Sequence, residues 1–120
     1  MSKSMLFEQV LMNAVAVAKA GTSYTSSRRF NDCNGSACLL IKSTAGSITV
    51  TQQCSLDNTN WYDPENSAGA VGAVEDTITV TTGRYLVFTP VLTPYIRFKV
   101  VEGNVAATDV TITLVYSAEV

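Results

Sequence analysis

The sequence predicts an all-β protein, an antiparallel β-sandwich or jelly-roll-like barrel of about eight strands. Short segments of alternating apolar and polar residues recur about every 8–12 residues, the pattern of strands with one face on a core. Turn-forming Gly, Asn, Asp and Pro residues separate these segments. The connections are too short for the crossovers that parallel strands need, so the strands are expected to run antiparallel.

The strands follow one another from residue 14 to the end of the chain. The clearest alternation lies in residues 47–56, where Ile48 and Val50 alternate with Thr49 and Thr51. The expected strands cover residues 14–20, 24–30, 37–42, 47–56, 76–82, 84–89, 95–101 and 110–116. Residues 67–74, rich in Ala and Gly, are expected to form a flexible connection, and no helix is expected after residue 20.

The first 20 residues are expected to form an N-terminal arm and first strand, ahead of a sandwich domain over residues 21–120, within a single domain overall. The pattern of residues 5–12 leaves two structures open. They can form a short amphipathic helix capped by Ser4, or an extended arm that adds to the sheet edge of another subunit. We therefore expect an arm or short helix that leads directly into the first strand.

The composition narrows the class of partner. The chain has 120 residues, of which 47% are hydrophobic and only 15% charged, and its net charge is -2. No basic stripe is present to neutralise phosphates, which counts against nucleic acid as a partner. No apolar run approaches the length that crosses a bilayer, so no membrane is expected either. A lightly charged surface favours contact with other proteins.

The chemistry of the side chains argues against catalysis. The chain contains no histidine, which removes Ser-His-Asp and Cys-His catalysis and histidine-containing zinc sites. The loop over residues 57–65 carries oxygen ligands of the kind that calcium prefers, but it lacks the spacing of an EF-hand, so turn formation is favoured. We expect no enzyme, no cofactor and no metal site.

Three cysteines are present, at positions 33, 38 and 54. Cys33 and Cys38 flank a hairpin-like turn at Asn34–Gly35, so a local disulfide between them is plausible. Free thiols are nevertheless favoured for all three, because an odd number of cysteines does not indicate a disulfide framework. Cys54 falls on the inward face of its strand and is expected in the core.

The aromatic residues allow a second class of function. Trp61 and Tyr62, together with Tyr95, can form a platform that binds sugars. The alternative, which we favour, places Trp61 in the core, because a sandwich core usually contains one large aromatic residue. The cations at Arg97 and Lys99 are expected to be solvated or to pair across a subunit interface.

Residues 46–116 resemble small β-sandwich proteins found among the virion components of tailed phages. The core of the resemblance is Ser-Leu-Asp-Asn-Thr-Asn-Trp-Tyr at 55–62, followed by Pro-Tyr-Ile-Arg at 94–97. The segments that carry it are 46–63, 83–88, 94–100 and 110–116. This resemblance implies a capsid decoration (cement) protein on the capsid surface of a virion, and it supplies no catalytic residues.

The implied partners are the major capsid protein, or another virion protein, and further copies of this chain, with a trimer favoured. A carbohydrate-binding module and a tail or filament-forming subunit remain the alternatives. The N-terminal segment, the arginine pair and the aromatic loop are the expected contact surfaces. The expected contact residues are Met5, Leu6, Phe7, Val10, Leu11, Arg28, Arg29 and Trp61.

Overall fold

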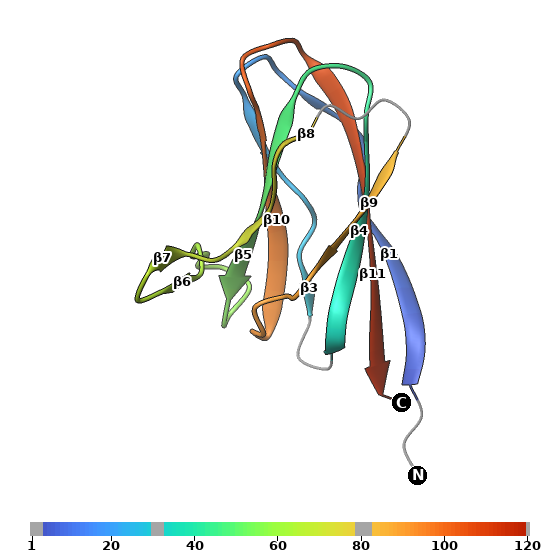
Figure 1. Cartoon of the computed structure of the whole chain (residues 1–120), viewed down its shortest axis with the longest axis vertical. Coiled ribbons are helices and arrows are strands. Elements are labelled where there is room, and N and C mark those ends of the chain that lie inside the picture. The colour runs from blue at the N-terminus through green and yellow to red at the C-terminus, as the bar shows by residue number, and fades with distance from the viewer. Residues whose placement is uncertain (1–3, 30–32, 79–82, 120) are drawn as a thin grey trace.

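Two antiparallel sheets pack face to face in this protein (Figure 1). The computed structural model describes residues 4–29, 33–78 and 83–119. Over these residues the elements are strands, which confirms the predicted all-β fold class. The described residues contain no helix, and therefore none that could span a membrane.

The strand order defines a jelly roll. Sheet A has the order β1 (Ser4–Val17), β11 (Thr108–Glu119), β4 (Cys33–Ser43) and β9 (Arg84–Phe88). Sheet B has the order β2 (Thr22–Tyr24), β10 (Tyr95–Glu102), β5 (Ile48–Ser55) and β8 (Ala73–Ile78). The chain passes between the sheets so that each sheet mixes early and late strands, the interleaving of a double-sheet jelly roll.

Three short strands complete the described structure. β3 (Arg28–Arg29) pairs with β10, and β6 (Glu65–Asn66) pairs with β7 (Gly69–Ala70) in a hairpin that projects from the sandwich (Figure 1). One continuous strand was expected over 24–30, and this prediction is wrong. The chain leaves β10 after Thr25, whose backbone N–H donates to the carbonyl of Phe98 at 2.9 Å. The expected strand at 76–82 extends beyond the described residues after position 78.

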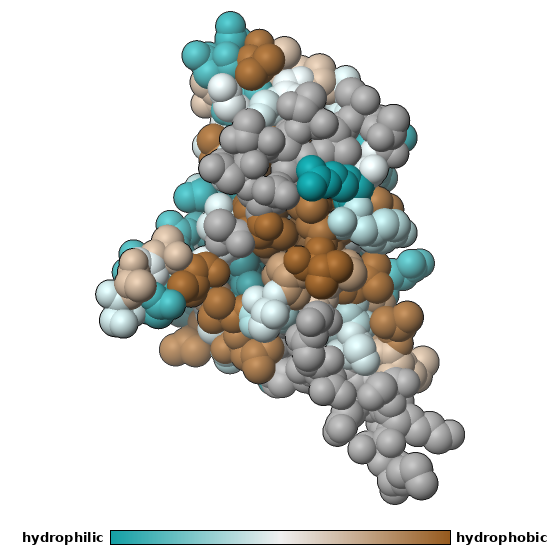
Figure 2. Space-filling model, in the orientation of Figure 1, coloured by the Kyte–Doolittle hydropathy of each residue, from teal (hydrophilic) through white to brown (hydrophobic). Residues whose placement is uncertain are grey.

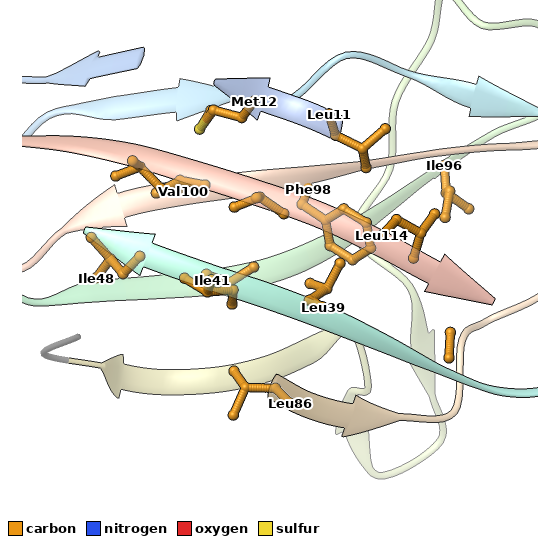
Figure 3. Close-up of a cluster of buried hydrophobic side chains, with 14 of the residues drawn as sticks. Leu11, Met12, Leu39, Ile41, Ile48, Leu86, Ile96, Phe98, Val100 and Leu114 are labelled. Carbon is orange, nitrogen blue, oxygen red and sulfur yellow. The ribbon is translucent and has the colours of Figure 1, made fainter. Parts of the chain in front are cut away.

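The core fills the space between the sheets, with side chains from both pointing toward one another (Figure 3). Alternate residues of β10 and β11 are buried, as the period-2 pattern predicts for strands with one face on a core. Phe98 lies at the centre, and its ring meets that of Phe88 edge to face at a centroid distance of 5.8 Å. The fully buried side chains include Leu39, Ile41, Ile48, Ile96, Phe98, Ile112 and Leu114.

The N-terminal segment is an edge strand of sheet A. β1 pairs with β11 from Ser4 opposite Glu119 to Val17 opposite Thr108. The helix considered for residues 5–12 is therefore wrong. Pairing with β11 places Leu11 and Met12 in the core, 4% and 3% exposed. This tertiary contact outweighs the helix propensity of the segment.

The turn expected at Asn34–Gly35 lies instead inside β4. Tyr116 of β11 pairs with Ala37, and Ala118, two residues later, pairs with Cys33. Four residues of β4 thus oppose two of β11, so the glycine and its neighbours are accommodated as a bulge rather than as a hairpin.

Glu102 ties together the loops at one end of the sandwich. Its side chain is 2% exposed, and its carboxylate accepts backbone N–H bonds from Ala20 at 3.0 Å, Ser47 at 3.2 Å and Val105 at 3.0 Å. These bonds, led by that from Ala20, lower the pKa of Glu102 to about 2 despite its desolvation. The three loops β1–β2, β4–β5 and β10–β11 meet here, at the top of Figure 1.

Candidate assembly and binding surfaces

The outer face of sheet A is apolar across all four strands. Cross-strand partners share a face of a sheet, so the register defines two rows of outward side chains. These rows are Glu8, Val115, Cys38 and Val87, and Val10, Thr113, Leu40 and Tyr85. We call these eight residues, with Leu6, the apolar face. Only one of the nine carries a charge.

Several side chains of the apolar face are open to solvent. Leu6 is 76% exposed, Val87 71%, Tyr85 66% and Val10 53%. Figure 2 views the sandwich from the edge where β8 and β9 lie, and apolar residues also gather across the middle of that view. A monomer rarely exposes a large contiguous apolar patch, and such patches mark interaction sites. The apolar face is thus the strongest candidate for contact with another protein.

The structure separates the five predicted contact residues of the N-terminus. Leu6 and Val10 lie on the apolar face, and Met5 is exposed at the start of β1. Phe7 faces the other way, and its ring stacks on that of Tyr116. Leu11 belongs to the core, so its side chain is not a surface contact. The prediction of a contact at Leu11 is wrong, because a bulge in β1 turns this residue inward.

Arg28 binds within the chain rather than pointing outward. Its guanidinium lies over the Tyr116 ring, 5.1 Å from the centroid, and Nε donates to the Tyr116 hydroxyl at 3.0 Å. Nη1 donates to Oε1 of Gln9 at 3.1 Å, and the backbone N–H of Ser26 donates to the carbonyl of Leu11 at 3.0 Å. These bonds close part of the β1 edge, so an arm that exchanges freely between subunits is not what the structure presents.

The outer face of sheet B has a different chemistry. The Arg97 guanidinium lies between two rings, 4.1 Å from the centroid of Tyr24 and 4.5 Å from that of Trp61. Trp61 is half-buried on this outer face, so its predicted place in the core is wrong. It follows a polar loop and pairs through its neighbour Tyr62 with Cys54 at the end of β5, which holds it at the surface.

A chain of hydrogen bonds through Gln53 to Asp63 also holds Arg97 in position. Its Nε donates to Oε1 of Gln53 at 2.8 Å, and Nε2 of Gln53 donates to Asp63 at 3.0 Å. Lys99 forms an ion pair with Asp63, at 3.7 Å. The predicted contact Arg29 lies over the Tyr95 ring, 6.0 Å from its centroid. We call the set of Tyr24, Gln53, Trp61, Asp63, Arg97 and Lys99 the aromatic–arginine face.

The loop considered for calcium is organised by Asp57. Its Oδ1 accepts backbone N–H bonds from Asn60 at 2.9 Å and Thr59 at 3.0 Å, and these bonds lower the pKa of the carboxyl. Ser55 donates its hydroxyl to the same oxygen. The carboxylate thus serves as the acceptor of a turn, and within the described ranges no group of three or more acidic, Cys or His side chains could hold a metal.

The structure describes the side chains of Cys38 and Cys54, and both are free thiols. Cys54 is buried at the end of β5, as expected, and burial raises the pKa of its thiol. Cys38 is half-buried on the apolar face. The side chain of Cys33 lies outside the described residues.

The sequence carried a signal for the apolar face that alternation alone misses. Residues 38–41 and 85–88 are apolar without interruption, and Val115 interrupts the Thr pattern of the last strand. Such runs indicate strands that are covered on both faces. Sheet A has a core on one side only, so the apolar side chains on its second side are open to solvent.

The fold and the two faces define this protein as a jelly-roll β-sandwich with one apolar and one aromatic–arginine outer surface. No protein-family model and no curated protein matches the chain. Its fold is similar to that of the SPBc2 prophage-derived protein YomS, with a TM-score of 0.62 and 12% identity over 98% of this chain and 97% of that one.

Two further solved structures share the fold. One is a chain of infectious bursal disease virus, Gx strain, with a TM-score of 0.54 and 11% identity over 97% of this chain and 32% of that one. The other is the carbohydrate-binding module CBM29-2, with a TM-score of 0.51 and 13% identity over 94% and 92%. At such identities the likeness shows the fold alone.

Proposed function

We propose that this chain is a structural protein of a tailed-phage virion, a capsid decoration protein that binds the shell through its apolar face. The single observation that carries the proposal is the pair of apolar rows across sheet A. A face of this kind has no function in an isolated monomer and suits permanent contact with protein. The fold likeness to a prophage-derived protein and to a viral chain supports the same class.

The proposed partners are the major capsid protein and further copies of this chain, with a trimer favoured. Glu8 is the only charged residue of the apolar face, and it lies on the edge strand β1, beside Val115. Attachment would therefore rest on apolar burial and shape more than on ion pairs. Binding through sheet A leaves sheet B turned away from the shell.

Immunogold electron microscopy of phage particles that carry this chain tests the proposal. Antibodies against the purified protein should label the head, and labelling should disappear when the gene is deleted while particles still form. Labelling confined to the tail would instead support the tail or filament alternative. Particles without label, with the protein free in the lysate, would overturn a structural role.

Carbohydrate binding is the second candidate, and the aromatic–arginine face favours it. Tyr62 is 68% exposed and Trp61 lies beside it, while Tyr95 is half-buried. The known module CBM29-2 shares the fold, which fits this candidate. Replacing Trp61 with Ala should abolish glycan binding and leave a folded protein. Unchanged binding by this variant would exclude Trp61 from any sugar site.

A further inference from the structure

Arg97 is held by two rings and a hydrogen bond, and among the residues that the structure describes no carboxylate forms an ion pair with it. The rings of Tyr24 and Trp61 both lie against its guanidinium, and its Nε donates to Gln53. Within the described residues, Nη1 and Nη2 have no hydrogen-bond partner and no carboxylate pairs with Arg97. Asp63, the nearest acid in this network, is bound to Gln53 and Lys99 instead. Two donors in a fixed plane are thus left for a ligand.

The charge around Arg97 favours an anion. Three cations, Arg29, Arg97 and Lys99, lie along the outer side of β10, and of these Lys99 forms an ion pair with Asp63. This stretch is therefore positive in a chain whose net charge is -2. Two parallel N–H donors of one guanidinium match the two oxygens of a carboxylate.

The rings beside Arg97 define what should carry that carboxylate. Tyr24 is 48% exposed and Trp61 is half-exposed, so apolar ring surface borders the free donors. A sugar ring with a carboxyl group presents an apolar C–H face next to an anion, which fits aromatic surface beside a guanidinium. The half-buried ammonium of Lys99 adds a donor suited to hydroxyls.

We propose that the aromatic–arginine face binds acidic glycans, with the Arg97 guanidinium holding the carboxylate of a uronic or sialic acid unit between Tyr24 and Trp61. This inference deepens the second candidate function, on which it rests, by naming the ligand class. It is compatible with attachment through sheet A, because the two faces lie on opposite sides of the sandwich.

The only tryptophan of the chain, Trp61, provides a direct readout. Its fluorescence should change saturably during titration with an oligogalacturonate or with sialyllactose, and not with neutral lactose. Raising the salt concentration should weaken binding, since one charge pair contributes to it. Acidic glycans that leave the fluorescence and the calorimetric titration unchanged would overturn the proposal.

Substitutions of Arg97 distinguish the contribution of its planar guanidinium to glycan binding from that of its positive charge. Arg97→Gln should weaken binding at least tenfold, and Arg97→Lys, which keeps the charge but loses the planar fork, should weaken it several-fold. Lys42→Gln, an equal charge change on sheet A, should bind within twofold of wild type. Circular dichroism should confirm that each variant is folded. If Lys42→Gln loses as much glycan affinity as Arg97→Gln, net charge alone explains the loss. That result would contradict the assignment of Arg97 as the group that holds the carboxylate.

Competing ligands distinguish the remaining outcomes. Polyglutamate that binds as tightly as the oligogalacturonate, with the same dependence on Arg97, would overturn the glycan assignment in favour of an acidic protein partner. Neutral and acidic sugars that bind equally would contradict the role of Arg97 but leave carbohydrate binding standing. If no sugar binds, both the role of Arg97 and the carbohydrate-binding function are overturned. The virion proposal would still depend on its own test by electron microscopy.

Discussion

The ring of Phe7 stacks on the ring of Tyr116 at a centroid distance of 5.5 Å and an interplanar angle of 23°. This contact joins the first long strand to the last, and Arg28 covers the same tyrosine from the neighbouring sheet. The N-terminal segment is therefore built into its own sandwich. Only its outward side chains, such as Leu6, remain for contact with a partner.

Replacing Phe7 with Ala should destabilise the fold by about 2 kcal/mol, since half-burial and ring stacking are both lost. Leu6→Ala, on the solvent side of the same strand, should change the free energy of unfolding by less than about 0.5 kcal/mol. Urea denaturation of both variants measures this. Equal costs would mean that the two sides of β1 are not distinguished as the structure requires.

Much of the fold can be predicted from the local alternation of apolar and polar residues, but the structure of the N-terminal segment cannot. β10 alternates between buried and half-buried residues along its whole length and β5 does so over residues 48–51, so the positions of both strands were predictable. Residues 5–12 lack such alternation, because a bulge at Leu11 shifts the register of β1. Their structure is determined by pairing with β11, more than ninety residues away, which no local pattern contains.

The candidate surfaces were predictable only in part. Leu6, Val10 and Trp61 were predicted as contact residues, and the structure places all three side chains at the surface. Tyr24 was considered with Trp61 for an aromatic platform, but the position of Arg97 beside both rings could not be predicted, since the three residues meet only when β2, β10 and the loop after β5 lie side by side. Arg28, Arg29 and Arg97 each lie over an aromatic ring that is distant in sequence, and only the pairing and packing of the strands bring these groups together.

Glu102 should make stability depend on pH. Its folded pKa of about 2 lies below the ordinary value near 4.3, so its contribution is complete above the ordinary value. It should be lost as pH falls from about 5 toward 2. The urea midpoint of wild type should therefore fall toward that of Glu102→Gln over this range.

Asp57→Asn provides the control for the pH experiment, because Asp57 also has a lowered pKa and contributes in the same direction. The difference between wild type and Glu102→Gln should persist in the Asp57→Asn background. If the two curves stay parallel from pH 6 to pH 2, the carboxylate does not bind the three loops as described.

Gly46 allows the close approach of Glu102. It has a φ of +71°, and a Cβ there would lie 2.7 Å from the carbonyl oxygen of Ala106 and 2.9 Å from Oε2 of Glu102. Gly46→Ala should therefore cost about 1–3 kcal/mol in thermal or urea unfolding. Gly83→Ala, with a φ of +94° and a nearest atom 3.8 Å away among the described residues, controls for backbone strain. Equal costs would show that the contact with Glu102 is unimportant.

Cys38 reports on the apolar face. In a Cys33→Ser background, a maleimide should label Cys38 quickly in dilute protein and slowly in concentrated protein, because the proposed self-assembly would cover the apolar face. Cys54 should react slowly throughout, since it is buried and its thiol pKa is raised. A labelling rate of Cys38 that does not depend on protein concentration would place self-assembly elsewhere.

Sedimentation velocity of wild type beside Val87→Lys tests the assembly role of the apolar face most directly. Val87 is 71% exposed, so the lysine should not disturb folding, while a charge on the apolar face, at the β9 end of its row, should prevent association. Thr51→Lys places the same charge on the outer side of sheet B and serves as the control. We predict that wild type and Thr51→Lys sediment as oligomers and Val87→Lys as a monomer. Identical sedimentation of Val87→Lys and wild type would contradict the account.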